Sequence, residues 1–533
     1  MSSDGFPPPP PPPPPRPPAI DRRKLLLATA FGGTSIGLLR ILGAPARPGS
    51  TSQSTSPTTS PTPTTALSPP NVDPPALAAA APQPGTDHTY GIVLAGGRVI
   101  DPASGFDGQA HVGIDGDRIT AISLEPLTGN NQIDVTGLVV APGFIDLLSY
   151  EPNEVGVWNK VADGVTTNMA MHGLNARADN FFRDYTGRVP VHFGGAFHDQ
   201  FTRLRRELDI DDDATPDQIA TMAAEMEEDV LAGFGGINFS PEYTPGTDLD
   251  EILALVAVAA RYDLTAFFHA RYSDPDRNSE AVAEVIQVAR QGGVSVHVEH
   301  VTSTGGTHTM EATLAQLNEA RSAGVDVTAC LYPYDFWATN LASNRFNGNW
   351  QERFGITYND LQIGGSETRV SEETFVQVRD AGNLVAALGS IPEEEVQLAL
   401  REPWTFIGSD AILEPDANNH PRASGTFSRV LGRYVRDLGV LTLPEALAKM
   451  TILPAQRIET PIPALRRKGR LQRGADADIT IFDPATVADT ATVANPGSPS
   501  TGVEWVLVAG QIVKRPDGVQ RDVLPGQPLT TEL

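Results

Sequence analysis

Short apolar runs alternate with segments of helical periodicity through the middle of the chain. The eight apolar runs are Val139–Leu147, Val165–Met171, Val189–Gly194, Ile237–Ser240, Ala266–His269, Val294–His300, Val325–Leu331 and Thr405–Ser409. Five segments carry apolar residues three and four positions apart: 215–233, 248–262, 279–291, 308–323 and 442–450. This alternation predicts an α/β fold, a (β/α)8 TIM barrel whose active site lies at the carboxyl ends of its parallel strands.

A different pattern flanks this region. Residues 90–142 and 468–514 contain short β-branched runs separated by Gly and Asp-Gly turns, which predict antiparallel strands. One small β-sandwich built from both ends is the simplest way to combine them. Segment 340–404 is too long for one helix and is a candidate lid. The predicted domains are the barrel at 141–465 and the two parts of the sandwich at 89–140 and 466–533.

The first ninety residues lack a pattern of hydrophobic and polar positions that predicts a folded domain. After a run of nine prolines, Arg22-Arg23 precedes a weakly apolar stretch, so residues 1–46 are expected to be a twin-arginine-type signal. If uncleaved, this signal is the expected contact with a membrane. Residues 47–88 are rich in Ser, Thr and Pro and are expected to be a disordered linker. The predicted location is extracellular, cell-surface or periplasmic.

Composition and charge exclude several classes of function. The chain has 39 Lys and Arg against 65 Asp and Glu, a net charge of −26, which would repel a nucleic-acid backbone. Its single cysteine, Cys330, excludes an intrachain disulfide and a cysteine-based zinc knuckle. The chain also lacks a phosphate-binding GxxxxGK[ST] loop. The expected partner is a small-molecule substrate.

Three histidines each close a different strand-like run. His172, His269 and His300 follow or end the second, fifth and sixth runs, and Asp410 follows the eighth. Three imidazoles and a carboxylate at a barrel mouth have the composition of a zinc site that leaves one position for water. Zinc lowers the pKa of a bound water to about 7, so a nearby carboxylate can accept its proton. Asp410 is the candidate for that proton transfer.

The alternation of side chains along a strand gives an orientation for the sixth run. His300 shares a face with Val296 and Val298, so it points into the barrel if that face lines the interior. On this interpretation His297 faces the helices. Glu299 then also faces away and either supports a ligand from behind or has a structural role.

Several motifs together resemble a known family. They are GGRVIDPASG, APGFID, GVTT, LYPYDFWAT, GSDAI, HPRASGTFSRVLGRYVRD, MTILPAQRI and KGRLQRGADADITIFDP. Between about residues 90 and 515 the chain resembles the amidohydrolase superfamily, specifically its N-acyl-D-amino-acid deacylase (D-aminoacylase-like) branch. The resemblance implies a (β/α)8 barrel with a β-sandwich from both ends. It also implies hydrolysis of the amide bond of N-acyl-D-amino acids at a strand-end zinc.

The resemblance assigns roles to individual residues. His269 and His300 match the family's fifth- and sixth-strand zinc ligands. Asp410 matches the eighth-strand aspartate that acts as general base and then as general acid. Arg422 in HPR matches the arginine that holds the substrate's carboxylate, a role suited to a planar bidentate guanidinium.

The sequence departs from the family pattern at the metal site. Where the superfamily has His-x-His on the first strand, this chain has Leu148 and Tyr150, which are not ordinary zinc ligands. The more exposed metal position is therefore expected to be lost or weak. His172 stands at or next to the family's second-strand Cys or Glu ligand. A single zinc ion on His172, His269 and His300 is therefore expected.

Four further residues concern the substrate or the metal. Tyr334 of YPY is expected to help bind substrate, and His420 either contacts substrate or caps a turn. Thr302 stands where the family has a lysine, which puts binding of the substrate's carboxylate in doubt. Glu242 either adds a carboxylate ligand or is a loop acid near a turn.

Three functions remain open from the sequence. The first is an exported zinc amidohydrolase acting on N-acyl, D-configured amino acids. The second is a cyclic-amide hydrolase or deaminase with the same fold. The third is a barrel that has lost catalysis and acts as an extracellular binding protein, which the loss of His-x-His at Leu148 and Tyr150 would allow. A substrate panel separates the first two, and metal content separates both from the third.

Overall fold

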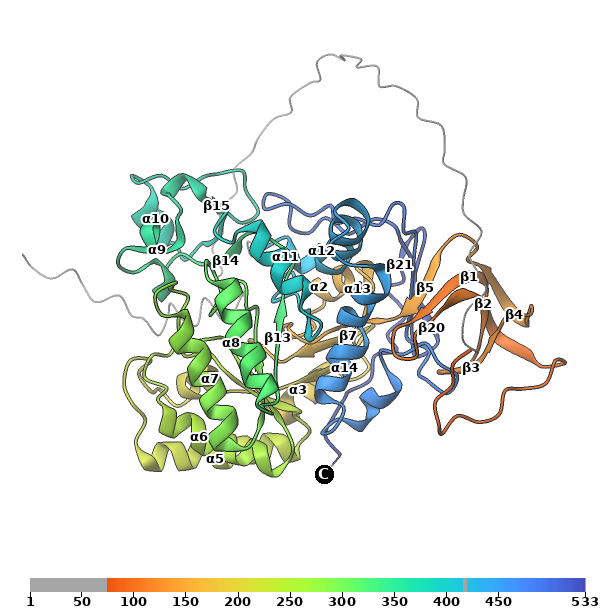
Figure 1. Cartoon of the computed structure of the whole chain (residues 1–533), viewed down its shortest axis with the longest axis horizontal. Coiled ribbons are helices and arrows are strands. Elements are labelled where there is room, and N and C mark those ends of the chain that lie inside the picture. The colour runs from red at the N-terminus through yellow and green to blue at the C-terminus, as the bar shows by residue number, and fades with distance from the viewer. Residues whose placement is uncertain (1–73, 416–418, 533) are drawn as a thin grey trace, which may run out of the picture.

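The described residues comprise an α/β body and a β-sheet at one end of it (Figure 1). The computed structural model describes residues 74–415 and 419–532. The predicted signal and the linker up to residue 73 lie outside this range. Residues 74–88 of the predicted linker lie inside this range, and there Leu77 donates a backbone hydrogen bond to the Arg473 carbonyl and packs against the sheet. No helix in the described ranges combines the length and apolarity needed to cross a membrane.

Strands from both ends of the chain form one continuous sheet. Its hydrogen-bonded order is β21-β20-β19-β18-β5-β1-β2-β3, with β4 paired to β1. The antiparallel pairing of β5 with β18 joins the two contributions, with Val140 opposite Ile481. The prediction that both ends build one β unit is therefore confirmed. The strands are β1 (Thr89–Asp101), β2 (Phe106–Asp115), β3 (Arg118–Ser123), β4 (Thr128–Asp134), β5 (Val139–Pro142), β18 (Ile479–Phe482), β19 (Val503–Val508), β20 (Gln511–Arg515) and β21 (Gly518–Val519).

Short parallel strands line the α/β body, and each of the eight predicted runs overlaps one. Their regular ladders form two arcs, β6-β7-β8 and β9-β10-β11-β12-β13-β17, so the hydrogen-bond ladder is not continuous around a ring. Only Ala196 separates β8 from β9. The strands are β6 (Phe144–Asp146), β7 (Val165–Ala170), β8 (His192–Gly195), β9 (Phe197–His198), β10 (Gly236–Phe239), β11 (Thr265–Phe268), β12 (Ser295–Val298), β13 (Val327–Leu331) and β17 (Thr405–Ile407).

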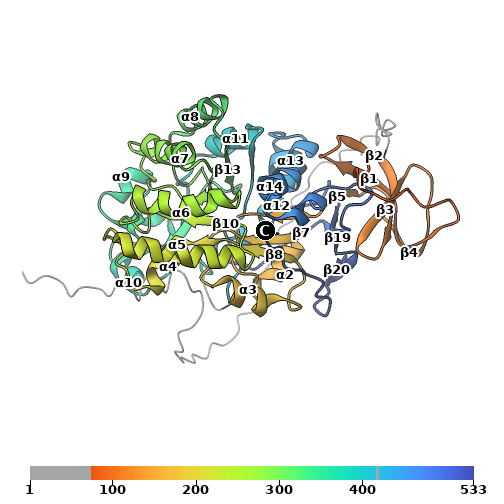
Figure 2. The same ribbon diagram turned by 90° about the horizontal axis from the view of Figure 1, so that it is seen from below.

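Helices cover the outer side of these strands, and Figure 2 shows α5 to α8 side by side. All five predicted helical segments are confirmed, as α5, α6, α7, α8 and α13. Thr215 and Gln218 form a capping box at the start of α5. The helices are α2 (Gly156–Ala162), α3 (Ala178–Tyr185), α4 (Asp199–Arg205), α5 (Pro216–Leu231), α6 (Leu249–Arg261), α7 (Asn278–Gly292), α8 (Met310–Ser322), α11 (Glu393–Arg401), α12 (Arg422–Arg429), α13 (Leu443–Met450) and α14 (Ile452–Ile458). A π-helical segment, Val430–Asp437, continues α12, and a short 3-10 segment, Pro463–Arg467, follows α14.

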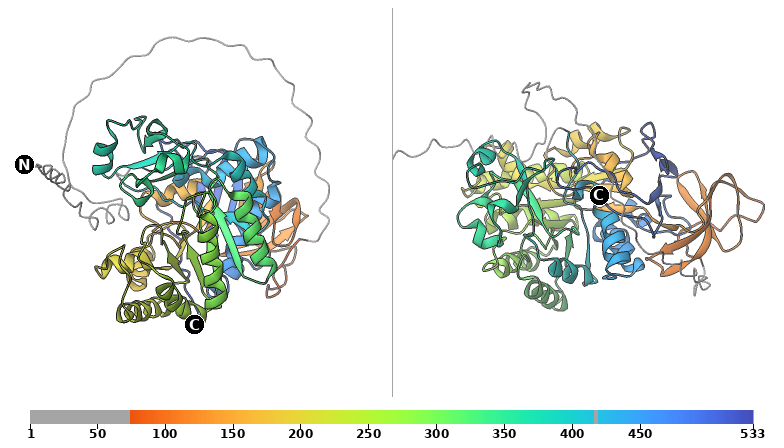
Figure 3. Two further views of the ribbon diagram at one scale, coloured as in Figure 1. Left: turned by 60° about the vertical axis from the view of Figure 1, so that its left-hand side comes forward. Right: turned by 90° about the horizontal axis from the view of Figure 1, so that it is seen from above.

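The chain between β13 and α11 forms a small unit of its own, here called the insertion (residues 337–387). Figure 3 shows it beyond one end of α7 and α8. Its core is aromatic, with Trp350 stacked on Phe375 at 5.6 Å between ring centres. Arg345 Nη2 donates to the Ser303 carbonyl at 2.6 Å, which places the insertion over the carboxyl end of β12. Its elements are β14 (Trp337–Asn340), α9 (Trp350–Phe354), β15 (Leu361–Ile363), α10 (Phe375–Asp380), β16 (Leu384–Ala387) and the 3-10 turns Asn344–Phe346 and Tyr358–Asp360.

A buried polar cluster joins the first parallel strand to the last. Asp146, which ends β6, accepts hydrogen bonds from the Ser409 backbone N–H at 3.0 Å and from its hydroxyl at 2.6 Å. Lys160 Nζ on α2 donates to the same carboxylate at 2.7 Å. The backbone N–H of Asp410 also donates to the Leu148 carbonyl at 2.7 Å. These contacts join β6 to β17 where no regular ladder does.

The C-terminal residues pair with the edge of β8 and with the residue that lies shortly before β10. The Phe193 N–H in β8 donates to Gln527, and the Leu529 N–H donates back to Phe193 at 2.7 Å. Thr531 donates to Gly233, just before β10, at 3.1 Å. Residues 526–531 therefore provide hydrogen-bond partners for backbone groups of Phe193 and Gly233. Without these residues, β8 and β10 would have to pair with each other directly to satisfy the same groups.

Substituting Lys160 with Met should destabilise the fold. The change leaves the Asp146 carboxylate buried without its cation, a loss of about 3–5 kcal/mol in the free energy of unfolding. Urea-induced unfolding measures this loss. Arg183→Met is the control, because its pair with Asp184 is more than half exposed and should change stability by at most about 0.5 kcal/mol. A loss below about 1 kcal/mol for Lys160→Met would contradict the assigned role of this junction.

Candidate active site

The carboxyl ends of β7, β11 and β12 bring the three predicted histidines together. His172, His269 and His300 each offer a ring nitrogen, and these atoms lie within 4.8 Å of one another. Their exposed fractions are 7 %, 2 % and 2 %. His269 Nδ1 faces His300 Nε2 at 3.1 Å. The strand-end positions predicted from the sequence thus form one buried cluster, here called the histidine cluster.

The other ring nitrogen of each histidine has a partner outside the cluster. Such partners fix the ring orientation, and a carboxylate behind an imidazole raises its basicity, as is usual around metal ligands in proteins. Three oriented, buried imidazole nitrogens are a donor set that fits zinc. The pairs are His172 Nδ1 with Glu299 Oε2 at 2.8 Å, His269 Nε2 with Glu242 Oε2 at 2.7 Å, and His300 Nδ1 with Thr304 Oγ1 at 3.3 Å.

The predicted orientation of side chains on β12 is wrong. Val296 and Val298 belong to the apolar core that includes the surrounding helices. The His297 ring instead stacks on Phe406 at 4.6 Å, among the side chains that fill the interior between the strands. The face that carries His297 therefore lines the interior.

Glu299 also points inwards, contrary to the prediction. It is fully buried and accepts a hydrogen bond from Asn238 Nδ2 at 2.6 Å, in addition to its contact with His172. His300 still reaches the cluster because its backbone has a left-handed φ of 27°, which ends the alternation just after β12. Two successive residues can therefore serve the same site.

Asp410 lies beside the cluster, directly after β17. Its Oδ1 is 3.7 Å from His172 Nε2, and its Oδ2 is 3.8 Å from His300 Nε2. Arg422 Nη2 pairs with Oδ2 at 2.9 Å, and the Tyr150 hydroxyl donates to Oδ1 at 3.4 Å. The carboxylate thus faces the same space as the ring nitrogens and is held from two further sides.

Arg422, the first residue of α12, is buried with an exposed fraction of 6 %. Its guanidinium carbon lies 4.3 Å from the centre of the Tyr332 ring. Burial opposes its charge, but Asp410 and Tyr332 more than compensate, so the pKa of Arg422 is raised. Its Nε and Nη1 are buried and have no hydrogen-bond partner in the described part of the chain. These N–H groups are available to a bound anion.

Tyr334 and His420 contact each other rather than the histidine cluster. The Tyr334 ring lies 5.1 Å from the His420 ring and 4.6 Å from the guanidinium of Arg429. His420 Nδ1 accepts the Arg422 backbone N–H at 2.9 Å, and its Nε2 lies 3.3 Å from the Phe336 carbonyl. Both His420 nitrogens are therefore engaged, which favours the turn-capping alternative. Burial, and then Arg422, hold the pKa of His420 well below its usual range.

The two residues at the positions of the missing His-x-His have different surroundings. Leu148 is buried in the interior apolar cluster with Met169 and Cys330. The Tyr150 ring meets His172 edge-on at 5.4 Å. Burial and the nearby Asp410 carboxylate raise the pKa of Tyr150 well above its ordinary value, so its hydroxyl remains a proton donor.

Sequence reasoning missed two residues near the cluster. His198 ends β9, its ring centre lies 5.9 Å from that of His172, and its buried Nδ1 has no partner among the described residues. The strand-end signal used for the other histidines would have found it. Arg345 comes from the insertion, and its Nε lies 3.8 Å from Glu242 Oε1. No motif marks Arg345 in the sequence.

Glu242 is a partner of His269 and of Arg345. Burial would raise its pKa, but Arg345 and His269 outweigh burial, so the pKa of Glu242 is lowered and the side chain is a carboxylate. The prediction left open whether Glu242 was a ligand or a loop acid. In the structure, Glu242 instead contacts His269 Nε2, the nitrogen of that ring that points away from the histidine cluster.

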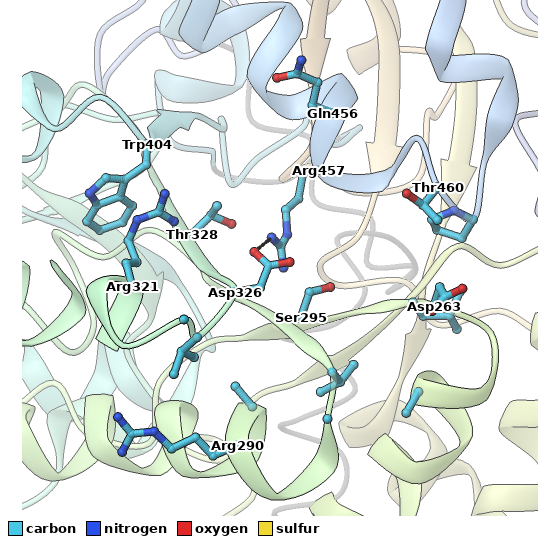
Figure 4. Close-up of a pocket in the computed structure, with 18 of the residues that line it drawn as sticks. Asp263, Arg290, Ser295, Arg321, Asp326, Thr328, Trp404, Gln456, Arg457 and Thr460 are labelled. Carbon is cyan, nitrogen blue, oxygen red and sulfur yellow. Dashed lines mark hydrogen bonds and ion pairs between the residues drawn. The ribbon is translucent and has the colours of Figure 1, made fainter. Parts of the chain in front are cut away.

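A cavity of about 880 Å³ lies at the opposite ends of the strands (Figure 4). Ser295 and Thr328, near the starts of β12 and β13, line it, as does Arg457 of α14. Arg457 pairs there with Asp326 at 2.7 Å. None of the cluster residues borders this cavity. Because parallel α/β barrels carry their catalytic residues at the carboxyl ends of the strands, the histidine cluster is the candidate active site.

Comparison with known proteins identifies relatives that match about four fifths of this chain. The chain matches the sequence model of the amidohydrolase family over residues 241–514. It is 32% identical over 458 residues to N-acyl-D-glutamate deacylase of Alcaligenes xylosoxydans xylosoxydans, covering 79% of this chain and 92% of that protein. The structure of N-acyl-D-glutamate deacylase of Bordetella bronchiseptica, complexed with zinc and a phosphonate inhibitor, matches with a TM-score of 0.71 at 28% identity and covers 83% of this chain and 100% of that one.

A D-aminoacylase structure concerned with its binuclear metal centre matches with a TM-score of 0.72 at 26% identity, again over 83% of this chain and 100% of that one. The family model spans about half of this chain, and the deacylase relative matches nearly throughout its own length. The resemblance inferred from the motifs is thereby confirmed. This chain belongs to the amidohydrolase family, in its N-acyl-D-amino-acid deacylase branch, and is a hydrolase of carbon–nitrogen amide bonds.

Proposed function

We propose that this protein hydrolyses the amide bond of N-acyl-D-amino acids with one zinc ion held by His172, His269 and His300. The observation that carries the proposal is the convergence of three buried, oriented ring nitrogens beside Asp410. The relatives named as N-acyl-D-glutamate deacylases support the substrate class, and the one complexed with zinc supports the metal.

The surroundings of Leu148 and Tyr150 support a single ion. Leu148 is packed among apolar side chains, and the Tyr150 hydroxyl is engaged with Asp410. Neither residue offers an imidazole at the place of the family's second metal position. The D-aminoacylase structure that is described in terms of one-metal activation and second-metal attenuation supports a one-metal enzyme.

The residues around the cluster have complementary roles in the proposed reaction. Bound zinc would supply a Lewis acid and lower the pKa of a bound water. Asp410 accepts the proton of the attacking water and passes it to the leaving nitrogen, as a general base and then a general acid. Tyr150 and Arg422 hold the Asp410 carboxylate in place. The free Nε and Nη1 of Arg422 bind the substrate's α-carboxylate, with Tyr332 rather than Tyr334 beside them.

We propose further that the two arcs of parallel strands form one (β/α)8 barrel. Two observations support this: the junction at Asp146 joins β6 to β17, and β8 continues into β9 with only Ala196 between them. Residues 89–140 and 466–533 then supply the β-sandwich, and residues 526–531 pack on β8. Export by the twin-arginine route is proposed from the sequence of residues 1–46 alone. The proposed partner is a small-molecule substrate.

Replacing His269 with Ala should abolish zinc retention and activity. The wild-type protein should carry about one zinc ion per chain, measured by elemental mass spectrometry after gentle desalting. Loss of a ligand should lower kcat/KM for N-acetyl-D-amino acids by at least about 100-fold, because disturbing even a supporting residue costs about 10–100-fold. His88→Ala is the control, since His88 is partly exposed in the β-sheet and pairs with Asp115.

Unchanged kcat in His269→Ala would contradict the assignment. If the wild-type protein takes up no zinc even after incubation with the metal, the non-catalytic binding barrel becomes the better interpretation. If it retains zinc and hydrolyses cyclic amides but not N-acyl-D-amino acids, the second function is correct.

Replacing Asp410 with Asn should separate proton transfer from metal binding. Asn cannot accept the proton, so kcat should fall by about 10²–10⁴-fold. Zinc content should remain at about one ion per chain, because the three histidine nitrogens supply the ligands. Steady-state kinetics and elemental analysis of the same preparation measure both quantities. Loss of zinc together with activity would show that Asp410 is itself a ligand.

A further inference from the structure

The hydroxyl of Tyr150 is a hydrogen-bond donor without a strong acceptor. It lies 3.4 Å from Asp410 Oδ1. This separation is longer than the roughly 2.5–3.0 Å of an ordinary O–H···O hydrogen bond. No other acceptor for the hydroxyl is resolved in the described part of the chain. A donor that is used so weakly can pass to a better acceptor at little cost.

The ring of Tyr150 is nevertheless fixed in the site. It meets the His172 ring edge-on at 5.4 Å between ring centres, and it packs against Gly173, where a Cβ atom would overlap it. Asn168 Nδ2 donates to the Tyr150 carbonyl at 2.9 Å, and Ser149 Oγ donates to Asn168 Oδ1 at 2.7 Å. The hydroxyl oxygen is therefore held in one place, while its proton can still turn about the C–O bond.

The two oxygens of Asp410 differ in their partners. Oδ2 pairs with Arg422 Nη2 at 2.9 Å. Oδ1 has the long contact with Tyr150, and His172 Nε2 lies 3.7 Å from it. The guanidinium stabilises negative charge on Oδ2, so the proton of the attacking water goes to Oδ1. A protonated Oδ1 is a poorer acceptor, and Tyr150 is released from it.

The attacking water fixes where negative charge develops on the substrate. To give up its proton, the water must lie within hydrogen-bonding distance of Asp410 Oδ1. Its oxygen then bonds to the carbonyl carbon, and the π electrons of the carbonyl move to the carbonyl oxygen. The two oxygens become neighbours on one tetrahedral carbon. The oxyanion therefore forms close to Oδ1, where the Tyr150 hydroxyl also lies.

The other side chains that contact Asp410 already have roles in the proposed reaction. Arg422 is assigned to the substrate's α-carboxylate, and the ring nitrogens of His172 and His300 are assigned to the metal. Tyr150 stands at one of the two positions of the missing His-x-His. This chain thus has a neutral hydroxyl donor beside Asp410 where the superfamily has an imidazole ligand.

We propose that Tyr150 is a catalytic residue that donates a hydrogen bond to the oxyanion of the tetrahedral intermediate. The inference rests on the proposed hydrolysis of N-acyl amino acids and adds a catalytic group to it. As the water attacks, its proton moves to Asp410 Oδ1, and the Tyr150 hydrogen bond turns from Oδ1 to the carbonyl oxygen.

The second half of the reaction reverses this change. When the intermediate collapses, the C–N bond breaks, the C=O bond forms again, and Asp410 gives its proton to the leaving nitrogen. Tyr150 then turns back to Asp410 and keeps its own proton throughout. A donor that is held in place and strengthens only as charge develops lowers the barrier without tightening substrate binding.

Replacing Tyr150 with Phe tests this role, because it removes the hydroxyl and keeps the ring that packs on His172. The substrate is N-acetyl-D-glutamate, since one relative is named as an N-acyl-D-glutamate deacylase. The kcat should fall by about 10²–10³-fold with KM little changed, as when one oxyanion donor is removed from other hydrolases. The zinc content should match that of the wild-type protein.

Binding of a mimic of the intermediate gives a readout that does not depend on turnover. N-methylphosphonyl-D-glutamate carries a charged tetrahedral phosphorus in place of the scissile carbonyl carbon, and calorimetric titration of the zinc-loaded protein measures its Kd. Tyr150→Phe should weaken this binding by about 10²-fold, close to the loss in kcat. If Tyr150 served only to hold Asp410, kcat would fall while the phosphonate bound as tightly as to wild type, which would overturn the inference.

Tyr243→Phe is the matched control. Tyr243 also packs on a cluster histidine, His269, at 4.6 Å between ring centres. Its hydroxyl instead lies 3.5 Å from Thr339 Oγ1 in the insertion. This variant should leave both kcat and the phosphonate affinity close to those of the wild-type protein.

The outcomes separate this inference from the proposed function. If wild type hydrolyses N-acetyl-D-glutamate and Tyr150→Phe is equally fast, the inference is overturned and the proposed function stands. Loss of zinc from Tyr150→Phe would show that the side chain acts through the metal site, and would also overturn it. If the wild-type protein hydrolyses no N-acyl amino acid, the proposed function fails. The phosphonate titration then tests Tyr150 alone, and equal or absent binding to wild type and Tyr150→Phe overturns the inference.

Discussion

The carboxylate of Asp146 holds together the two ends of the parallel strand system. It ends the first strand, accepts both donors of Ser409 after the last strand, and binds Lys160 from the covering helix. Asp410 immediately follows Ser409, and Tyr150 lies a few residues beyond Asp146. The position of the Asp410 carboxylate relative to the histidine cluster is therefore set by this one buried junction. Its cost in desolvated charge is offset because every partner lies within hydrogen-bonding distance.

The local sequence pattern was sufficient to predict most strands and helices, but it did not predict how these elements pack against one another. Apolar runs predicted every parallel strand except the two-residue β9, because this signal depends on neighbouring residues. The alternation rule failed just after β12, where His300 adopts a left-handed backbone, so that both Glu299 and His300 reach the site. The packing of residues 526–531 on β8 could not be predicted, because it joins segments more than 300 residues apart.

The residues of the candidate site could likewise be predicted only in part from the sequence. The three histidines and Asp410 were predictable because each follows a strand, and strand ends meet at one face. Arg345 was not predictable, because its contribution depends on how the insertion folds back over Ser303. The choice between Tyr332 and Tyr334 likewise depends on the turn after β13, which leaves Tyr332 under Arg422 and turns Tyr334 toward Arg429. Motif matching finds the segment, and only the fold decides which aromatic ring lies beside Arg422.

The packing of residues 526–531 has a consequence for biosynthesis. These residues follow every parallel strand in the chain, yet they fill the gap between β8 and the segment before β10. During translation, the edge of β8 therefore stays without these partners until residues 526–531 have emerged from the ribosome. Contacts of such large sequence separation slow folding and leave strand edges open to wrong partners in the meantime. Pairing of this edge therefore depends on residues that are synthesised after every parallel strand of the described chain.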